Sequence, residues 1–235
     1  MLFLDLTLPT LAENLALDEA LLDAAESGEA GTEFFRLWES AEVAVVLGRS
    51  SRRAEEVDLP ACEAQGVPVL RRCSGGCAVV VGPGCLMYSV VLSYELRPEL
   101  RILEEAHRLV LGNVQRAIPG SRLDGTSDLV WQGRKFSGNS LRCKRSHLLY
   151  HGTLLYGFSL PLISKYLRTP PREPEYRAGR SHQEFVGNAP IPAAVLRKSL
   201  RESFDAAGCL TAWPRELTQR LVVERYSQAA WNEER

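Results

Sequence analysis

The chain has 235 residues, a formal net charge of −1 and 45% hydrophobic residues, the composition of an ordinary globular protein. The near-zero charge excludes a nucleic-acid coat or a polybasic membrane anchor, and no run approaches the roughly 18 apolar residues of a membrane helix. The N-terminus has no basic region followed by an apolar stretch, so no signal peptide is indicated. We therefore predict a cytoplasmic protein with six reduced cysteines and neither a membrane nor a nucleic-acid partner.

The first half of the chain predicts one helix followed by several strands. Thr10 and Glu13 have the spacing of a capping box, and apolar residues at helical spacing follow as far as Gly28. The next segments are short, apolar and bounded by turn residues, which is typical of strands. The predicted strands are 35–38, 43–47, 67–72, 78–81 and 86–92.

The second half predicts a long helix, a hairpin, another strand and two amphipathic helices. The helix covers 101–118, the hairpin 128–136 and the strand 151–158. The two terminal helices are expected near 192–207 and 214–227. Residues 168–182 are rich in proline and arginine and predict a linker or a surface loop. The order of elements indicates an α+β fold, with mixed β-sheets flanked by helices, and no repeated βαβ unit.

Arg71 and Arg72 stand directly before a short glycine-rich stretch, Cys73-Ser74-Gly75-Gly76. Glycines let the backbone approach a ligand closely, and successive N–H groups in such a turn can cradle an anion. Arginine adds charge-assisted hydrogen bonds to a carboxylate or a phosphate. The same pattern also fits a tight turn with two surface arginines, so both interpretations stand at this level.

Two further segments contain candidate chemical groups. Lys135 lies among small polar residues in Gly133-Arg134-Lys135-Phe136-Ser137-Gly138-Asn139, where an ammonium can stabilise charge that develops during acyl transfer. His151 begins the last predicted strand and can orient a substrate or carry a proton. Taken alone, a turn lysine is usually solvated and a single histidine is usually structural. The chain has no CxxC, HExxH or G-x-S-x-G motif and no Walker sequence, so any use of ATP is not of the P-loop kind.

Six ordered blocks between about residues 12 and 188 resemble the lipoate–protein ligase A family of the biotin/lipoate ligase superfamily. They are NLALDEALL, VVLGRSSRRAEEVDL, GVPVLRRCSGGCAVV, TSDLVWQGRKFSGNSLR, HGTLLY and KYLRTPPREPEYRAGRSHQEFV. The resemblance implies the catalytic-domain fold of that superfamily. It also implies one catalytic domain over 1–235, in which 190–235 is a helical tail and not a full accessory C-terminal domain.

The resemblance implies that lipoate, or octanoate, is the acyl substrate and that ATP with Mg²⁺ activates it to an acyl-adenylate. The acceptor would be a lysine of an E2 lipoyl domain or of glycine cleavage H protein. Lys135 would lie against the acyl carbonyl and the α-phosphate. Asp128 would hold Mg²⁺ or orient that lysine. The remaining substrate-binding positions implied by the resemblance are Arg72, Ser74, Gly75, Gly76, Ser137, Arg142, His151 and Thr153.

The sequence departs from the family pattern at three places. Cys77 replaces a third glycine, Val81-Gly82 stands where a His-Asp pair is usual, and Cys85 replaces an asparagine. Only about 45 residues follow the last block. Either a separate subunit supplies the accessory part, or the enzyme works without it. An octanoyl or lipoyl transferase, which forms an acyl-thioester on a cysteine, is the main alternative. The loop 119–126 before the hairpin holds no cysteine, which favours the ligase. A non-catalytic homologue that binds a lipoyl group or an acceptor domain is the third interpretation.

Overall fold

The computed structural model describes residues 1–28, 32–170 and 173–234. Its largest unit is a six-stranded sheet with the strand order β10-β11-β6-β2-β1-β12. Strands β10, β11, β6 and β2 pair antiparallel, whereas β1 pairs parallel with both β2 and β12. The bounds in sheet order are Asn139–Cys143, His147–Leu155, Cys85–Ser93, Phe34–Glu39, Leu2–Asp5 and Gly208–Cys209.

Two three-stranded sheets complete the β structure, and both border the candidate site. One has the order β4-β3-β5, and its strands β4 and β5 lie on either side of the glycine-rich stretch in the sequence. The other is the antiparallel meander β7-β8-β9. The first contains Val69–Arg71, Ala44–Leu47 and Val79–Val81. The second contains Arg122–Asp124, Asp128–Trp131 and Arg134–Ser137.

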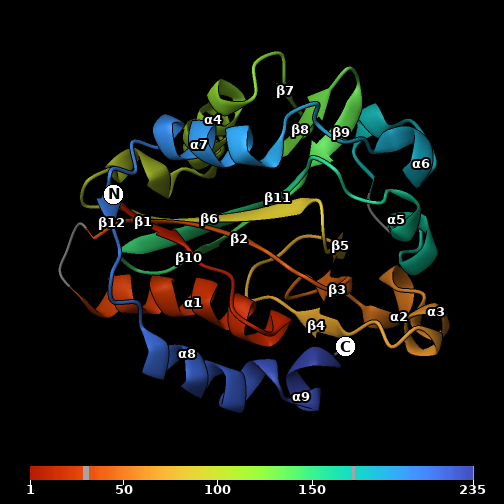
Figure 1. Cartoon of the computed structure of the whole chain (residues 1–235), viewed down its shortest axis with the longest axis horizontal. Coiled ribbons are helices and arrows are strands. Elements are labelled where there is room, and N and C mark those ends of the chain that lie inside the picture. Colours follow the sequence, from red (N-terminus) through yellow and green to blue (C-terminus); the bar gives the residue numbers. More distant parts are fainter. Residues whose placement is uncertain (29–31, 171–172, 235) are drawn as a thin grey trace.

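Helices cover both faces of the large sheet (Figure 1). Helix α1 (Leu11–Ser27) lies on one face with α8 (Arg215–Leu221) beneath it, while α4 (Leu103–Ala117) and α7 (Ala193–Ser203) lie on the other. Shorter helices gather at one end of the sheet. These are α2 (Arg53–Glu56), α3 (Leu59–Ala64), α5 (Pro161–Tyr166) and α6 (His182–Phe185).

The remaining helical turns lie at the margins. Two are 3₁₀ turns, η1 (Pro98–Arg101) and η2 (Glu175–Arg177), and the chain ends with the π-helical segment η3 (Val222–Tyr226) and helix α9 (Ala229–Asn232). Among the described residues, no helix combines the length and the apolar content required to cross a membrane.

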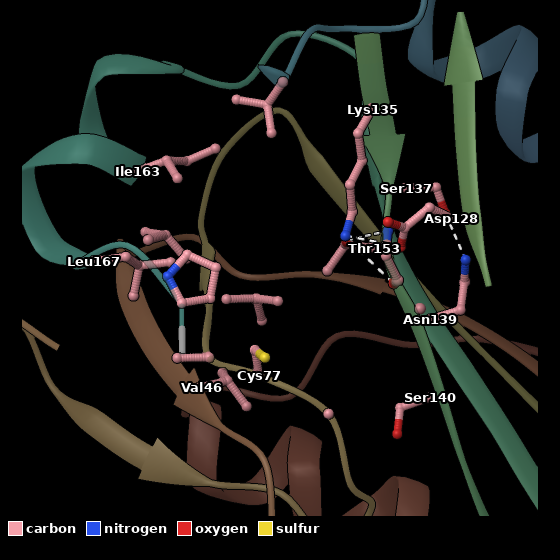
Figure 2. Close-up of a pocket in the computed structure, with 18 of the residues that line it drawn as sticks. Val46, Cys77, Asp128, Lys135, Ser137, Asn139, Ser140, Thr153, Ile163 and Leu167 are labelled. Atoms are coloured by element: carbon pink, nitrogen blue, oxygen red, sulfur yellow. Dashed lines mark hydrogen bonds and ion pairs between the residues drawn. The ribbon is translucent and has the colours of Figure 1, made fainter. Parts of the chain in front are cut away.

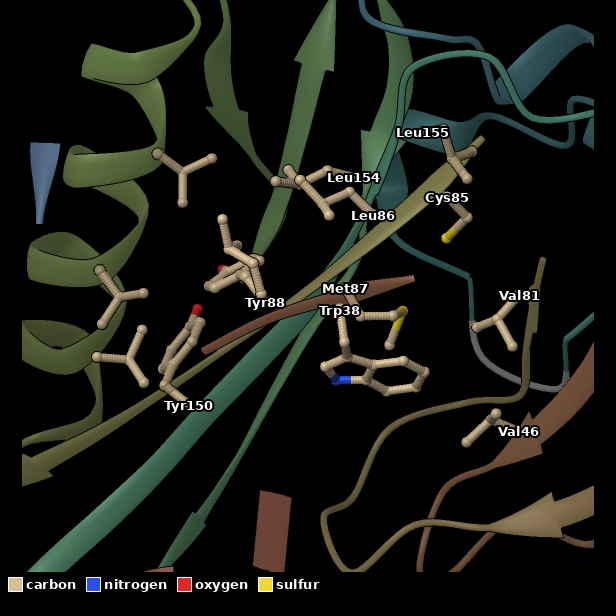
Figure 3. Close-up of a cluster of buried hydrophobic side chains, with 14 of the residues drawn as sticks. Trp38, Val46, Val81, Cys85, Leu86, Met87, Tyr88, Tyr150, Leu154 and Leu155 are labelled. Atoms are coloured by element: carbon tan, nitrogen blue, oxygen red, sulfur yellow. The ribbon is translucent and has the colours of Figure 1, made fainter. Parts of the chain in front are cut away.

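The two central strands are buried along their whole length. All nine residues of β6 and all nine of β11 are buried, because helices cover both sides. Tyr88 and Tyr150 point to the α4 side, and Trp38 and Met87 to the opposite side (Figure 3). That opposite side, which faces α1, also carries the candidate site.

The first helix confirms its sequence signal. Thr10 Oγ1 accepts from the Glu13 N–H at 3.2 Å, and Glu13 Oε2 accepts from the Thr10 N–H at 2.8 Å, which completes the predicted capping box. The hairpin at 128–136 is also present as β8 and β9. Its turn residues Gln132 and Gly133 have φ of 47° and 77°, as a tight two-residue hairpin turn requires.

The predicted starts of one strand and one helix were wrong. The strand predicted at 151–158 is β11 at His147–Leu155, so His151 lies in its middle and not at its start. A strand buried on both faces shows no alternation that would mark its first residue. The helix predicted from 101 begins at Leu103, after the 3₁₀ turn η1. The stretch 168–182 contains η2 and the start of α6, and its residues 171 and 172 lie outside the described residues.

Candidate functional site

A cavity of about 330 Å³ opens between the large sheet, the meander and the helices at the sheet's end, a size within the usual range for small-molecule sites. Figure 2 shows Lys135 entering it from β9, with Ser137, Asn139 and Thr153 on one side and Val46, Ile163 and Leu167 opposite. Part of the wall is apolar and continuous with the core. The apolar lining includes Val46, Val79, Val80, Met87, Leu155, Ile163, Leu167, Phe185 and Val186.

Lys135 is held at the polar end of this cavity. Its Nζ lies 2.8 Å from Asp128 Oδ1, across the two strands of the β8–β9 hairpin, and its side chain is 28% exposed. The amine lies over Gly138, where an added Cβ would come 3.2 Å from Nζ. A cation is thus fixed by one carboxylate but still open to a ligand, the arrangement needed to stabilise a developing oxyanion or a phosphate.

The glycine-rich stretch is shaped by Arg72. Its guanidinium is buried and donates to Ser74 Oγ at 3.2 Å, to the Val46 carbonyl at 3.2 Å and to the Cys77 carbonyl at 3.1 Å, as well as to the Gly75 carbonyl. Burial lowers the pKa of Arg72 to about 10. Arg72 therefore folds the loop around itself, in addition to lining the cavity.

Close backbone packing explains one glycine beside this loop. A Cβ on Gly48 would lie 1.8 Å from the Gly76 carbonyl oxygen, so the β3 end and the loop touch through backbone alone. Gly76 itself has a φ of 84°, in the left-handed region that favours glycine. Geometry therefore requires glycine at Gly76, whereas a Cβ at Gly75 would meet nothing within 4 Å.

A row of polar side chains crosses the sheet beneath the cavity. Strand register places Arg36 opposite Ser89, Ser89 opposite His151, and His151 opposite Ser140 on four adjacent strands. Ser74 Oγ lies 2.5 Å from His151 Nε2. Nδ1 faces the Asp18 carboxylate, which favours the tautomer with the ring proton on Nδ1 and with Nε2 accepting from the Ser74 hydroxyl.

Asp18, on α1, contacts the side chains of this row. Its Oδ1 accepts from Arg36 at 2.6 Å and from Ser89 at 2.8 Å, and its Oδ2 lies 3.6 Å from His151 Nδ1. Burial raises the pKa of Asp18, but Arg36, His151 and Ser89 outweigh it and hold the pKa below its ordinary value of 3.8. The buried Asp18 is therefore ionised, and its negative charge faces the Nδ1 edge of His151, which lines the cavity.

Arg142 does not reach the cavity. It pairs with the buried Glu19 of α1 at 2.7 Å, and Arg225 and the Tyr226 hydroxyl bind the same carboxylate. Ser74 and Gly75 are also not among the residues that line the cavity. Of the predicted site residues, the structure brings these to the cavity wall: Arg72, Gly76, Asp128, Lys135, Ser137, His151 and Thr153.

The stretch 168–182 contributes residues that the sequence did not single out. Arg168, Arg177 and His182 line the cavity. We call the described residues 173–182 the strap. Arg180 anchors it by donating to the Gly133 carbonyl at 3.0 Å and to the Tyr176 carbonyl at 2.8 Å. A proline-rich segment looks like a linker in sequence because its structure comes from contacts with the hairpin and not from local periodicity.

Other lining residues were missed as well. Asn139 connects the site internally: its Oδ1 accepts from Tyr88 at 2.6 Å, and its Nδ2 donates to Ser137 Oγ at 3.0 Å. Glu56 lines the cavity and accepts from the Ala78 N–H at 2.6 Å. Asn139 belongs to the segment 133–139 that contains Lys135, whereas nothing in the local sequence distinguishes Glu56 from its charged neighbours.

Only one of the three departures from the family pattern lies on the cavity wall. Cys77 lines the cavity, whereas Val81 and Cys85 are buried in the core. Burial raises the pKa of the Cys85 thiol to about 12, so it is not a nucleophile at neutral pH.

The role of metal ligand does not fit Asp128 as it stands. Its Oδ1 holds Lys135, and its Oδ2 accepts from the Tyr176 hydroxyl at 2.7 Å. Within the described ranges, no three His, Cys, Asp or Glu side chains gather as a metal site. Of the two roles expected for Asp128, the contacts favour orientation of the lysine.

Comparison with known families and proteins agrees with this geometry. Residues 10–190 match the model of the lipoyl protein ligase A/B catalytic domain. A probable lipoate-protein ligase A of Mycoplasma pneumoniae is 30% identical over 74% of this chain, which spans only 51% of that relative. An octanoyltransferase LipM of Carboxydothermus hydrogenoformans is 28% identical, with 94% of this chain and 93% of the relative covered.

Solved structures show the same fold. A lipoate-protein ligase A bound with ATP superposes with a TM-score of 0.82 and 22% identity, covering 99% of both chains. A bi-partite lipoate protein ligase from Thermoplasma acidophilum, described with its E2 lipoyl domain, gives 0.78 and 24%, covering 99% of this chain and 95% of that one. The predicted fold class is thereby confirmed. With three quarters of its length matched by the family model, the chain belongs to the lipoyl protein ligase A/B catalytic-domain family, an enzyme family of protein ligases and octanoyltransferases.

Proposed function

We propose that this protein is a lipoate–protein ligase. It activates lipoate with ATP to lipoyl-AMP and then transfers the lipoyl group to a lysine of an acceptor protein. The carboxylate of lipoate attacks the α-phosphorus of ATP and pyrophosphate leaves. The acceptor amine then attacks the acyl carbonyl of the mixed anhydride and AMP leaves.

One observation carries the proposal: a single cavity joins an apolar wall to a cationic end. The apolar side suits an acyl tail, which gains about 0.8 kcal/mol for each buried CH₂. At the other end lies the ammonium of Lys135, and Arg168 and Arg177 also line the cavity. An acyl-adenylate has the matching order of groups, an apolar chain followed by an anhydride and a phosphate.

The proposed roles follow from the contacts. Lys135 stabilises the negative charge on the acyl carbonyl and on the α-phosphate in both steps. His151, which contacts Ser74, and Thr153, Ser137 and Gly76 form the wall around the bound intermediate. Arg72 and Ser74 act by fixing the loop that carries Gly75 and Gly76. Mg²⁺ enters only as the counter-ion that accompanies ATP.

For the partner we propose an E2 lipoyl domain or a glycine cleavage H protein. A structural relative of this chain is described with its E2 lipoyl domain. We further propose that residues 1–235 act as one catalytic domain, since the tail packs against it: Asn232 Oδ1 accepts from the Arg71 N–H at 2.9 Å, next to the glycine loop. The need for a separate accessory subunit is then testable by assaying the chain alone.

The test is lipoate-dependent exchange of pyrophosphate into ATP, with Lys135→Ala as the inactive variant. Wild type should support exchange, and the variant should lose at least 100-fold, about the loss seen when one oxyanion-stabilising group is removed. An exchange rate unaffected by Lys135→Ala would refute the role given to the lysine.

A transferase remains the second candidate, favoured by two observations. The octanoyltransferase relative matches this chain over nearly its whole length, and Cys77 lies on the cavity wall. In that case octanoate would pass from a carrier thioester to the Cys77 sulfur, the carrier thiol would leave, and the acceptor lysine would then take the acyl group. An octanoyl adduct at Cys77 in the absence of ATP would support this candidate against the ligase.

A further inference from the structure

Tyr176 reaches from the strap to the carboxylate that holds Lys135. Its hydroxyl donates to Asp128 Oδ2 at 2.7 Å, while Asp128 Oδ1 lies 2.8 Å from Lys135 Nζ. The two oxygens of one carboxylate are therefore divided between the phenol and the lysine. The Asp128 side chain is only 14% exposed, so water replaces neither partner easily.

The ring of Tyr176 is fixed independently of its hydroxyl. It packs against Phe185, with ring centroids 5.1 Å apart. It also lies against Gly125, where an added Cβ would come 3.1 Å from Cε1. Arg180 binds the Tyr176 carbonyl and the hairpin carbonyl of Gly133. Removing the hydroxyl alone should leave this packing in place.

The phenol is a permanent donor in this position. Burial and then the charge of Asp128 raise the pKa of Tyr176 above its ordinary value of 10.0. A protonated phenol neutralises part of the carboxylate's charge and fixes its plane. Without it, both oxygens become available to Lys135, and the amine is held more tightly and turned away from a ligand.

We propose that Tyr176 is a positioning residue for Lys135: it occupies one oxygen of Asp128, so that the ammonium is presented to the cavity when the strap is seated. This inference rests on the proposed acyl-transfer function and adds a residue to it. It also gives the strap a role beyond contact with the substrate. Tyr176 of the strap and Lys135 bind the same carboxylate, that of Asp128, so the position of the strap affects the orientation of the lysine.

Tyr176→Phe is the test variant, and Tyr156→Phe is its matched control. Tyr156 also donates to a carboxylate, Glu39, at 2.9 Å, but does not line the cavity. We expect Tyr176→Phe to lower kcat about tenfold, as for loss of one hydrogen bond to a charged group, with little change in KM for lipoate. The control should match wild type.

A second readout does not depend on turnover. Trace acetylation of Lys135, followed by peptide mass spectrometry, should slow about threefold in Tyr176→Phe relative to wild type, since one hydrogen bond to a charged group is redistributed. In an Asp128→Asn background the same substitution should change labelling less than twofold. Unchanged labelling in Tyr176→Phe would overturn the positioning role even if the enzyme is active. Slowed labelling in a protein with no acyl-transfer activity would instead preserve the coupling and refute the proposed function.

Discussion

The buried pair Asp18–Arg36 provides the sharpest test of the polar row beneath the site. The two side chains are 2% and 0% exposed, and Asp18→Asn keeps the shape while removing the negative charge. Breaking a buried ion pair from one side costs about 3–5 kcal/mol. Arg36 retains neutral acceptors, the carbonyls of Leu6 and Asn14 and the Asn14 side chain, so we expect the lower end, about 3 kcal/mol. For a protein of this size that lowers Tm by roughly 6–12 °C.

The assay is urea unfolding of wild type and Asp18→Asn, with Asp23→Asn as the matched control. Asp23 lies on the same helix and pairs with Lys144 at 2.6 Å, but both side chains are 26% exposed. The control should cost less than about 1 kcal/mol. A loss below about 1 kcal/mol in Asp18→Asn itself would refute the charged state of the pair.

The same pair predicts a dependence on pH. The pKa of Asp18 in the folded protein lies below its ordinary value of 3.8. Its ionisation therefore stabilises the fold fully above the unfolded pKa, and that contribution is lost as the pH falls below 3.8 toward the folded pKa. The stability difference between wild type and Asp18→Asn should be constant at neutral pH and shrink only in acid. A difference that shrinks near pH 7 would show that another group is responsible.

Two other predictions concern the tail and the thiols. Asn232→Ala removes the acceptor of the Arg71 N–H and the donor to the Tyr226 and Gln228 carbonyls, so it should destabilise the protein by about 1–3 kcal/mol in urea unfolding; an unchanged midpoint would mean that the tail does not hold β4. With a thiol reagent in native buffer, the exposed Cys77, Cys143 and Cys209 should react quickly, and the buried Cys62, Cys73 and Cys85 only after unfolding, because burial raises the pKa of each buried thiol. Rapid loss of all six thiols would contradict the packing.

Local signals predicted the elements whose structure is determined locally. The capping box at Thr10 and the turn at Gln132-Gly133 each depend on neighbouring residues, and both were found. The row Arg36–Ser89–His151 depends on strand register across the large sheet, to which the sequence gives no local clue. His151 was therefore recognised as a candidate, but not its partner Asp18.

In the candidate site, too, the residues that lie close together in the sequence were predicted and the distant ones were not. Lys135 and Asp128 lie seven residues apart on one hairpin, and the ordered blocks were sufficient to identify both. Tyr176 reaches Asp128, and Arg177 and Glu56 reach the cavity wall, through packing of segments far apart in the sequence, which no local pattern predicts. Arg142 matched a family position, yet here it is engaged by Glu19, which a sequence block alone does not reveal.

The most direct measurement of the central claim is the intact mass of an acceptor lipoyl domain after incubation with this protein and lipoate, with and without ATP. The proposed ligase should add one lipoyl group to the acceptor only when ATP is present, and Lys135→Ala should add none. Octanoylation from an acyl-carrier thioester without ATP, with no lipoylation when ATP and lipoate are supplied, would contradict the ligase and establish the transferase.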